Sequence, residues 1–205
     1  TSDPAVSVIR STKNFGVWAR FAGALLANTT YVCVFDDDTI PGKGWFDNCL
    51  DTMRKKEGLL GTIGVIFRPN AENRYETYTR VGWDPGNNDE IQEVDIVGHS
   101  WFFKREWLGH LWSTAPDYSI MCYAGEDIGF SYALQKIGIK TYVPPHPKGC
   151  PDMFGSDPTL AVNYGTDEVA TWRFHADKFT AALRFFRARG FKLLLDETCR
   201  AVCER

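Results

Sequence analysis

The sequence lacks a long apolar run, a strong excess of either charge and a recognisable export signal. No stretch approaches the roughly 18 consecutive apolar residues that a membrane-spanning helix needs. The first residues show no basic stretch followed by an apolar one, so we expect no secretory signal in the sequence as given. The 23 basic and 26 acidic residues leave a net charge of −3, which argues against a nucleic-acid partner held by a basic surface. These absences predict a protein without a transmembrane segment, with the cytoplasm as its default location.

The six cysteines include no C-x-x-C pair, so the spacing typical of zinc and redox sites is missing. Cys33 falls in an apolar strand pattern and Cys49 on the apolar face of a helix pattern, which predicts buried thiols. Cys199 and Cys203 are four residues apart, which makes them neighbours on a helix rather than metal ligands. We therefore expect reduced cysteines and no disulfide framework.

The composition of the chain is that of a folded domain. Its 205 residues, of which 44% are hydrophobic, predict a single domain over residues 1–205, either complete or a fragment of a longer chain. Aromatic residues make up 14% and include seven tryptophans. This content fits a well-packed core, and it also fits a ring-lined cleft that stacks on sugars or bases.

Hydrophobic periodicity predicts alternating strands and helices. Strands are expected at residues 6–9, 31–35, 62–67, 94–103 and 140–143. Helices are expected at 14–28, 45–56 and 126–137, with a last helix that ends before Gly190. This alternation predicts an α/β sandwich, a class that gathers its functional residues at the ends of strands.

A long polar segment over residues 68–92 interrupts this alternation. Tyr75, Thr77, Thr79 and Val81 occupy alternate positions in it, which predicts a solvated strand or hairpin. Loops of this length in compact domains are often functional. We expect the segment to shape a substrate-binding site.

Three adjacent carboxylates, Asp36 to Asp38, follow the apolar run 31–35. On an extended chain Asp36 and Asp38 point to one side and Asp37 to the other. Two carboxylates at the end of a buried strand suit a hard divalent cation such as Mg²⁺ or Mn²⁺. A solvated acidic turn would also explain the triplet, but the strand before it and the Pro-Gly turn after it favour a metal site.

A second acidic pair, Glu126 and Asp127, opens the helix predicted at 126–137. Carboxylates are favoured in the first turn of any helix, so the pair alone does not require a function. In a cleft, Asp127 could act as a general base whose direction the helix fixes. Neighbouring carboxylates would raise its pKa and the helix terminus would lower it, which leaves the net direction open.

Two further segments carry polar and aromatic residues at strand ends. The segment Gly98-His99-Ser100-Trp101 combines a glycine, which allows close approach of a ligand, with a tryptophan that could stack on a sugar or fill the core. His146 stands between prolines at a strand end and could be a third protein ligand of the metal, or an ordinary loop histidine.

These motifs occur in the order seen in one family, and over roughly residues 6–175 the chain resembles the GT-A glycosyltransferases, most closely the family-2-like group. The resemblance rests on Asn14-Phe15-Gly16, Arg20-Phe21-Ala22, the DXD-like triplet 36–38, the segment 94–103 and the ED-like pair 126–127. It implies a Rossmann-like, three-layer α/β/α sandwich with a mainly parallel central sheet.

The resemblance also implies roles for individual residues. The substrates would be a nucleotide-diphospho-sugar, with a UDP-sugar favoured, and a hydroxyl of a glycan or glycoconjugate, and Mn²⁺ or Mg²⁺ would be the cofactor. Asp127, with Glu126 beside it, would deprotonate the acceptor in a hexosyl transfer with inversion. Retention is the alternative, because the sequence does not show where the acceptor hydroxyl lies. The segment 68–92 would shape the acceptor site. The remaining candidates are metal ligands (Asp36, Asp38, His146), donor contacts (Lys13, Asn14, Arg20, Asp36, Asp37) and acceptor contacts (Gly98, His99, Ser100, Trp101).

One departure from the family pattern concerns the start of the chain. The triplet begins after only 35 residues, so the first nucleotide-binding strand and its helix are missing or shortened. Either the chain is a fragment or the base of the nucleotide is held differently. A non-catalytic module that binds nucleotide sugars or glycans on the same fold is therefore an alternative. A metal-dependent phosphohydrolase is another, although no histidine-rich set of ligands for two metals is visible.

Overall fold

The computed structural model describes residues 4–68, 74–75, 77–83, 86–117, 122–161 and 171–196, with only the backbone at residues 161 and 171–174. The helices are α1 (Ala19–Ala24), α2 (Trp45–Lys55), α3 (Leu108–Thr114), α5 (Glu126–Gln135), α6 (Pro158–Ala161) and α7 (Thr171–Ala188). The strands are β1 (Tyr31–Phe35), β2 (Gly58–Phe67), β3 (Tyr78–Val81), β4 (Gln92–Val94), β5 (Ile96–Lys104) and β6 (Lys140–Val143). Two short 3₁₀ turns, Arg105–Trp107 and Pro151–Met153, complete the described elements.

The strands form one sheet in the order β1-β5-β2-β6-β4, with β3 paired to β2 outside this path. The α/β class is confirmed, but the expectation of a mainly parallel sheet is wrong for the described strands, because only β2 and β6 run parallel. Parallel neighbours need a long connection, and β3, β4, β5, α3 and α5 all lie between β2 and β6 in the chain. Between β2 and β5 the described residues contain no helix, and β2 pairs antiparallel with both β3 and β5.

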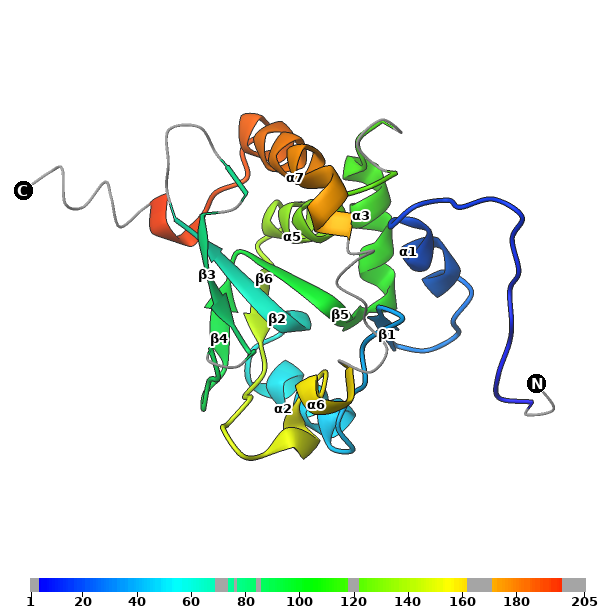
Figure 1. The fold of residues 1–205 in the computed structure, drawn as a ribbon, viewed down its shortest axis with the longest axis vertical. Coiled ribbons are helices and arrows are strands. Elements are labelled where there is room, and N and C mark those ends of the chain that lie inside the picture. The colour runs from blue at the N-terminus through cyan, green and yellow to red at the C-terminus, as the bar shows by residue number, and fades with distance from the viewer. Residues whose placement is uncertain are drawn as a thin grey trace, which may run out of the picture.

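Helices cover both faces of this sheet (Figure 1), with α3, α5 and α7 on one side and α2 and α6 on the other. Alternation along β5 supplies both faces. On one face Phe103 packs edge-on against Phe130 of α5, with ring centroids 4.9 Å apart. On the other face Phe35 of β1 packs against Phe46 of α2 at 6.1 Å. The three-layer arrangement therefore places β1, and the acidic triplet that follows it, between two helical layers.

Most predicted elements are confirmed. The strands at 31–35 and 140–143 have the expected bounds, and the helices predicted at 45–56 and 126–137 appear as α2 and α5. The polar segment 68–92 contributes the short strand β3, as its alternation predicted. The last helix, α7, ends before Gly190, whose φ of +100° fits the left-handed conformation that glycine favours after a helix. Cys199 and Cys203 lie outside the described residues.

The N-terminal predictions are wrong in two respects. Residues 6–9 lie outside the sheet, and their apolar side chains are exposed, Ile9 by 73%. The helix predicted at 14–28 shrinks to α1, because Gly16 turns the chain with a φ of +75° and donates its N–H to Asn14 Oδ1 at 2.8 Å. Among the described residues, no helix has both the length and the apolar composition needed to cross a membrane.

Candidate active site

The acidic triplet is held in place by the backbone of β5. Where β1 ends, the Asp36 N–H donates to the carbonyl of His99 at 3.0 Å. The hydroxyl of Thr39 donates to the same carbonyl, also at 3.0 Å. These two bonds fix the turn that carries Asp36 to Asp38 directly beside His99.

Three side chains converge at this turn. One ligand atom each from Asp36, Asp38 and His99 lies within 4.8 Å of the others, and all three residues are half-buried. Asp37 is exposed and is not part of this group. Two carboxylates and one imidazole form a donor set that suits Mn²⁺ and that Mg²⁺ can share with additional oxygens. The residues therefore fit the metal that the sequence predicted, with His99 completing the set.

The backbone at His99 is unusual and explains its direction. His99 has a φ of +63°, the one positive value at a non-glycine residue in the described chain. The pairing of β5 with β2 also shifts register opposite this point, between Gly61 and Ile63. Such a conformation is costly for a residue with a side chain and is found disproportionately at functional sites. Burial lowers the pKa of His99, which favours the neutral imidazole that can ligate a metal.

The structure places His146 elsewhere, which corrects the predicted ligand set. Its Nδ1 lies 2.8 Å from the carbonyl of Pro144, and its Nε2 accepts from the Gly155 N–H at 3.2 Å. The side chain is fully buried against Trp45 and Phe154, with ring centroids 5.5 Å and 5.3 Å away. Both ring nitrogens hydrogen-bond to the backbone around His146, and the histidine that lies beside the carboxylates is His99.

The pair Glu126–Asp127 begins α5 after Gly125, whose φ of +92° turns the chain into the helix. Both carboxyl groups are buried, at 7% and 8% exposure. Asp127 Oδ1 accepts from the Ile128 N–H at 2.7 Å, whereas Glu126 Oε2 has no hydrogen-bond partner. Burial is the largest cause that raises the pKa of each group, and the charge of Asp127 adds to the effect on Glu126.

Arg20 of α1 connects the two acidic motifs. Its Nη1 pairs with Asp36 Oδ1, and its Nη2 lies 3.7 Å from Glu126 Oε1. The guanidinium also lies over the ring of Trp101, 5.1 Å from its centroid. The α1 region is anchored beside α5 because the Trp18 indole donates to the carbonyl of Ala124 at 3.3 Å. The predicted diphosphate contact is thus engaged by protein carboxylates, and it brings the triplet and the α5 pair into one site.

The other predicted contacts divide into exposed and buried residues. Lys13 and Asn14 are exposed in the N-terminal segment and make local turn bonds. Gly98 has open space where a side chain would project, and its contact with a ligand stays a prediction. Ser100 and Trp101 are buried, so neither is exposed for the predicted acceptor contact.

The burial of Ser100 and Trp101 follows from the alternation of β5. The Ser100 hydroxyl hydrogen-bonds that of Thr62 at 2.7 Å inside the sheet layer. Trp101 points to the opposite face and packs edge-on against Phe21 at 5.4 Å. Because this strand is covered on both faces, successive side chains enter the cores on opposite sides of the sheet. His99 differs: its backbone is left-handed, and its side chain is only half-buried.

Two aromatic residues at the site were not predicted from the sequence. The hydroxyl of Tyr75 donates to Asp127 Oδ2 at 3.3 Å. The ring of Trp83 packs on that of His99, with centroids 5.9 Å apart and planes inclined by 33°. The one available signal was that both are large aromatic residues within the otherwise polar segment 68–92.

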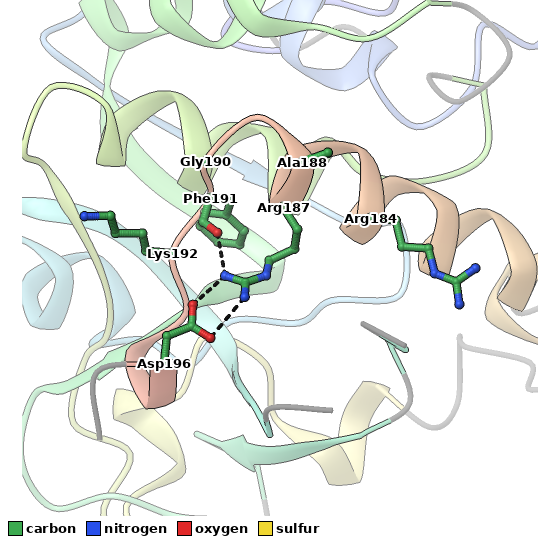
Figure 2. A pocket seen from close by; sticks show the side chains of 7 residues that line it. All are labelled: Arg184, Arg187, Ala188, Gly190, Phe191, Lys192 and Asp196. Atoms are coloured by element: carbon green, nitrogen blue, oxygen red, sulfur yellow. Dashed lines mark hydrogen bonds and ion pairs between the residues drawn. The ribbon is translucent and has the colours of Figure 1, made fainter. Parts of the chain in front are cut away.

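A separate cavity of about 450 Å³ lies at the end of α7, away from these motifs (Figure 2). Its lining consists of Arg184, Arg187, Ala188, Gly190, Phe191, Lys192 and Asp196. Figure 2 shows the Arg187 guanidinium turned toward Asp196 and toward the carbonyl of Phe191, which it reaches at 2.7 Å. Arg187 pairs with Asp196, and the lining of this cavity contains none of the residues of the acidic site.

Comparison with protein families gives one match. The sequence model of glycosyl transferase family 2 matches residues 1–112, which include α1, β1, the triplet and β5. The pair Glu126–Asp127 lies beyond the matched residues. A comparison with curated proteins found no match.

Proposed function

Because the chain belongs to glycosyl transferase family 2, we propose that it transfers a hexosyl group from a nucleotide-diphospho-sugar to a hydroxyl of a glycan or glycoconjugate. A UDP-sugar is the favoured donor, and the anomeric configuration is inverted. The observation that carries this proposal is the convergence of a donor group, Asp36, Asp38 and His99, with the buried pair Glu126–Asp127 through Arg20.

The proposal assigns a divalent cation, Mn²⁺ or Mg²⁺, to Asp36, Asp38 and His99. When bound, such a cation supplies positive charge that stabilises the departing diphosphate. The hydrogen bonds to the carbonyl of His99 hold this turn before any ligand arrives, so the donor atoms need little rearrangement. Trp83 limits the rotation of the His99 ring by packing against it.

Asp127 is the proposed general base. It takes the proton of the acceptor hydroxyl while the acceptor oxygen bonds to the anomeric carbon. The bond from that carbon to the diphosphate oxygen breaks, and its electron pair leaves with the diphosphate. Burial raises the pKa of Asp127, which makes the carboxylate a stronger base near neutral pH than an exposed one.

Arg20 keeps the two halves of the site together in this proposal. Its guanidinium offsets the charge of Asp36 and of the buried Glu126, so these two carboxylates can lie near each other.

We also propose a cytoplasmic location, which the free thiols of Cys33, Cys49 and Cys150 support.

Calorimetric titration of UDP-sugars and GDP-sugars, with and without Mn²⁺, tests the function. We expect one donor class to bind and to require the cation, and we expect slow release of the nucleoside diphosphate to follow. Asp38→Asn should abolish the cation dependence, and Asp37→Asn, with the same loss of charge outside the donor group, should keep it. Binding without any turnover, unaffected by Asp127→Asn, would indicate the non-catalytic module. Phosphate release from nucleotides without a sugar would indicate the phosphohydrolase.

A further inference from the structure

Tyr75 reaches the proposed base from a distant part of the chain. It belongs to the polar segment between β2 and β3, 52 residues before Asp127 in the sequence. Its phenol donates to Asp127 Oδ2 at 3.3 Å. A neutral hydroxyl that donates to a carboxylate stabilises the charged form and fixes where the oxygen lies.

The ring of Tyr75 is held firmly by its neighbours. It packs against Phe67 of β2 and Phe179 of α7, with centroids 5.3 Å and 5.0 Å away. The Tyr75 N–H donates to the hydroxyl of Thr180 at 3.4 Å. Contacts to both the sheet and α7 leave the phenol little freedom, so its hydroxyl is a fixed reference point for Asp127.

Asp127 is thereby held at both of its oxygens. Oδ1 accepts from the Ile128 N–H at 2.7 Å, within the first turn of α5. Oδ2 accepts from Tyr75 and retains a second lone pair, since a carboxylate oxygen can accept two hydrogen bonds. The two donors fix the plane of the carboxylate and leave Oδ2 able to accept a proton.

We propose that Tyr75 is a positioning residue that orients the Asp127 carboxylate toward the acceptor hydroxyl. The proposal rests on the proposed function, in which Asp127 is the base. Tyr75 acts through Asp127 and does not touch the reacting atoms. Among the described residues, the other charged groups that face Asp127 are Glu126, its neighbour on α5, and Arg20 from α1.

The matched pair of variants is Tyr75→Phe and Tyr78→Phe. Tyr78 belongs to the same aromatic cluster, 6.0 Å from Tyr75 between ring centroids, but its hydroxyl accepts from Arg80 instead. Both substitutions remove one hydroxyl and retain the ring. The assay is release of UDP or GDP, with water as acceptor, from a panel of UDP-glucose, UDP-galactose, UDP-N-acetylglucosamine and GDP-mannose in the presence of Mn²⁺.

We expect Tyr75→Phe to lower kcat about tenfold, the scale of a misaligned general base, with the KM for the donor unchanged. The acidic limb of its pH profile should move to higher pH, because the charged carboxylate loses a donated hydrogen bond. Tyr78→Phe should match the parent protein in both measurements. A purely structural role of Tyr75 would lower activity in proportion to the folded fraction and would leave the limb in place.

The outcomes separate this proposal from the function on which it rests. Equal kcat and an equal acidic limb in Tyr75→Phe and the parent protein would overturn the role of Tyr75. A higher kcat in Tyr75→Phe would overturn it as well, because the hydroxyl would then block the base. If Asp127→Asn retains full turnover, or no sugar donor is turned over by the parent protein, the proposed function fails instead. Thermal melting of each variant identifies the temperature range in which all are folded.

Discussion

Arg20 and Asp36 form an ion pair that ties α1 to the end of β1. About a quarter of each side chain remains exposed, 24% and 25%, so the pair lies at the edge of the core rather than on the open surface. The second guanidinium nitrogen is 3.7 Å from Glu126. A planar guanidinium can serve two carboxylates at once, which an ammonium group cannot do with the same geometry. This relationship gives the acidic site its charge balance.

We expect Arg20→Ala to destabilise the fold by about 2 kcal/mol, since it leaves Asp36 and the buried Glu126 without their cation. Arg20→Lys should recover part of the lost stability, because it keeps the positive charge but not the planar guanidinium that serves two carboxylates. Urea denaturation measures both. The control is Arg54→Ala, whose exposed pair with Asp51 should contribute less than about 0.5 kcal/mol. Similar losses from Arg20→Ala and Arg54→Ala would show that the Arg20 pair acts as an ordinary surface contact.

Local sequence was sufficient for the parts of the fold that depend on local preference. The apolar run 31–35 and the run 140–143 form strands with the predicted bounds, and the acidic triplet lies at a strand end as expected. Residues 6–9 are also mostly β-branched and apolar, but they pair with nothing in the described sheet. A strand needs hydrogen-bonding partners, and a short apolar run does not indicate whether a partner exists.

The composition of the site depended on long-range geometry that a sequence pattern does not contain. The prolines around His146 suggested a ligand held at a strand end, but its ring nitrogens hydrogen-bond the backbone at Pro144 and Gly155 instead. His99 reaches the carboxylates through a left-handed backbone that propensities disfavour for histidine. Sheet direction likewise depended on which strands become neighbours, because β2 pairs antiparallel with β5 and parallel with the more distant β6.

The two histidines give a direct test of the metal assignment. His99→Ala should weaken Mn²⁺ binding by tenfold or more, since it removes one of three donors. His146→Ala should leave the affinity of the folded protein for Mn²⁺ unchanged. It should instead lower the free energy of unfolding by about 2 kcal/mol, because the Gly155 N–H loses its buried acceptor. Electron paramagnetic resonance of free Mn²⁺ measures the affinity. Weaker binding in His146→Ala alone would reverse the assignment of the two residues.

Gly155 offers an independent test of the packing around His146. A Cβ at this position would lie 1.7 Å from Thr62 Oγ1 and 2.9 Å from an atom of Trp45. We expect Gly155→Ala to destabilise the protein by roughly 2 kcal/mol, in the range for overpacked cores. Gly109→Ala is the control, because Gly109 lies in α3 with open space around it. Gly109→Ala should raise the free energy of unfolding by about 0.5–1 kcal/mol, because alanine has a better helix propensity than glycine. Thermal melting measures both variants, and a Gly155→Ala protein as stable as the parent would contradict the close contact with Thr62.

The burial of Asp127 predicts a conflict between stability and activity. Because burial raises its pKa above the ordinary value of 3.8, the native state binds this proton more tightly than the unfolded state does. The contribution of Asp127 to the free energy of unfolding is therefore greatest at low pH and is lost as pH rises through the raised pKa. An asparagine at this position does not ionise, so Asp127→Asn keeps this contribution at high pH. Its amide oxygen can still accept from the Ile128 N–H.

We expect Asp127→Asn to be more stable than the parent protein by about 1–3 kcal/mol above neutral pH and to have lost catalytic turnover. The gain should vanish near pH 4, where the parent carboxyl is already protonated in the folded state. Urea denaturation at pH 4 and at pH 8 measures the difference, and Asp47→Asn, an exposed change in the first turn of α2, controls for a general effect of lost charge. Equal stability of Asp127→Asn and the parent protein at pH 8 would mean that the ionised carboxylate is well solvated in the fold. Asp127 would then lack the raised basicity that the proposed mechanism assigns to it.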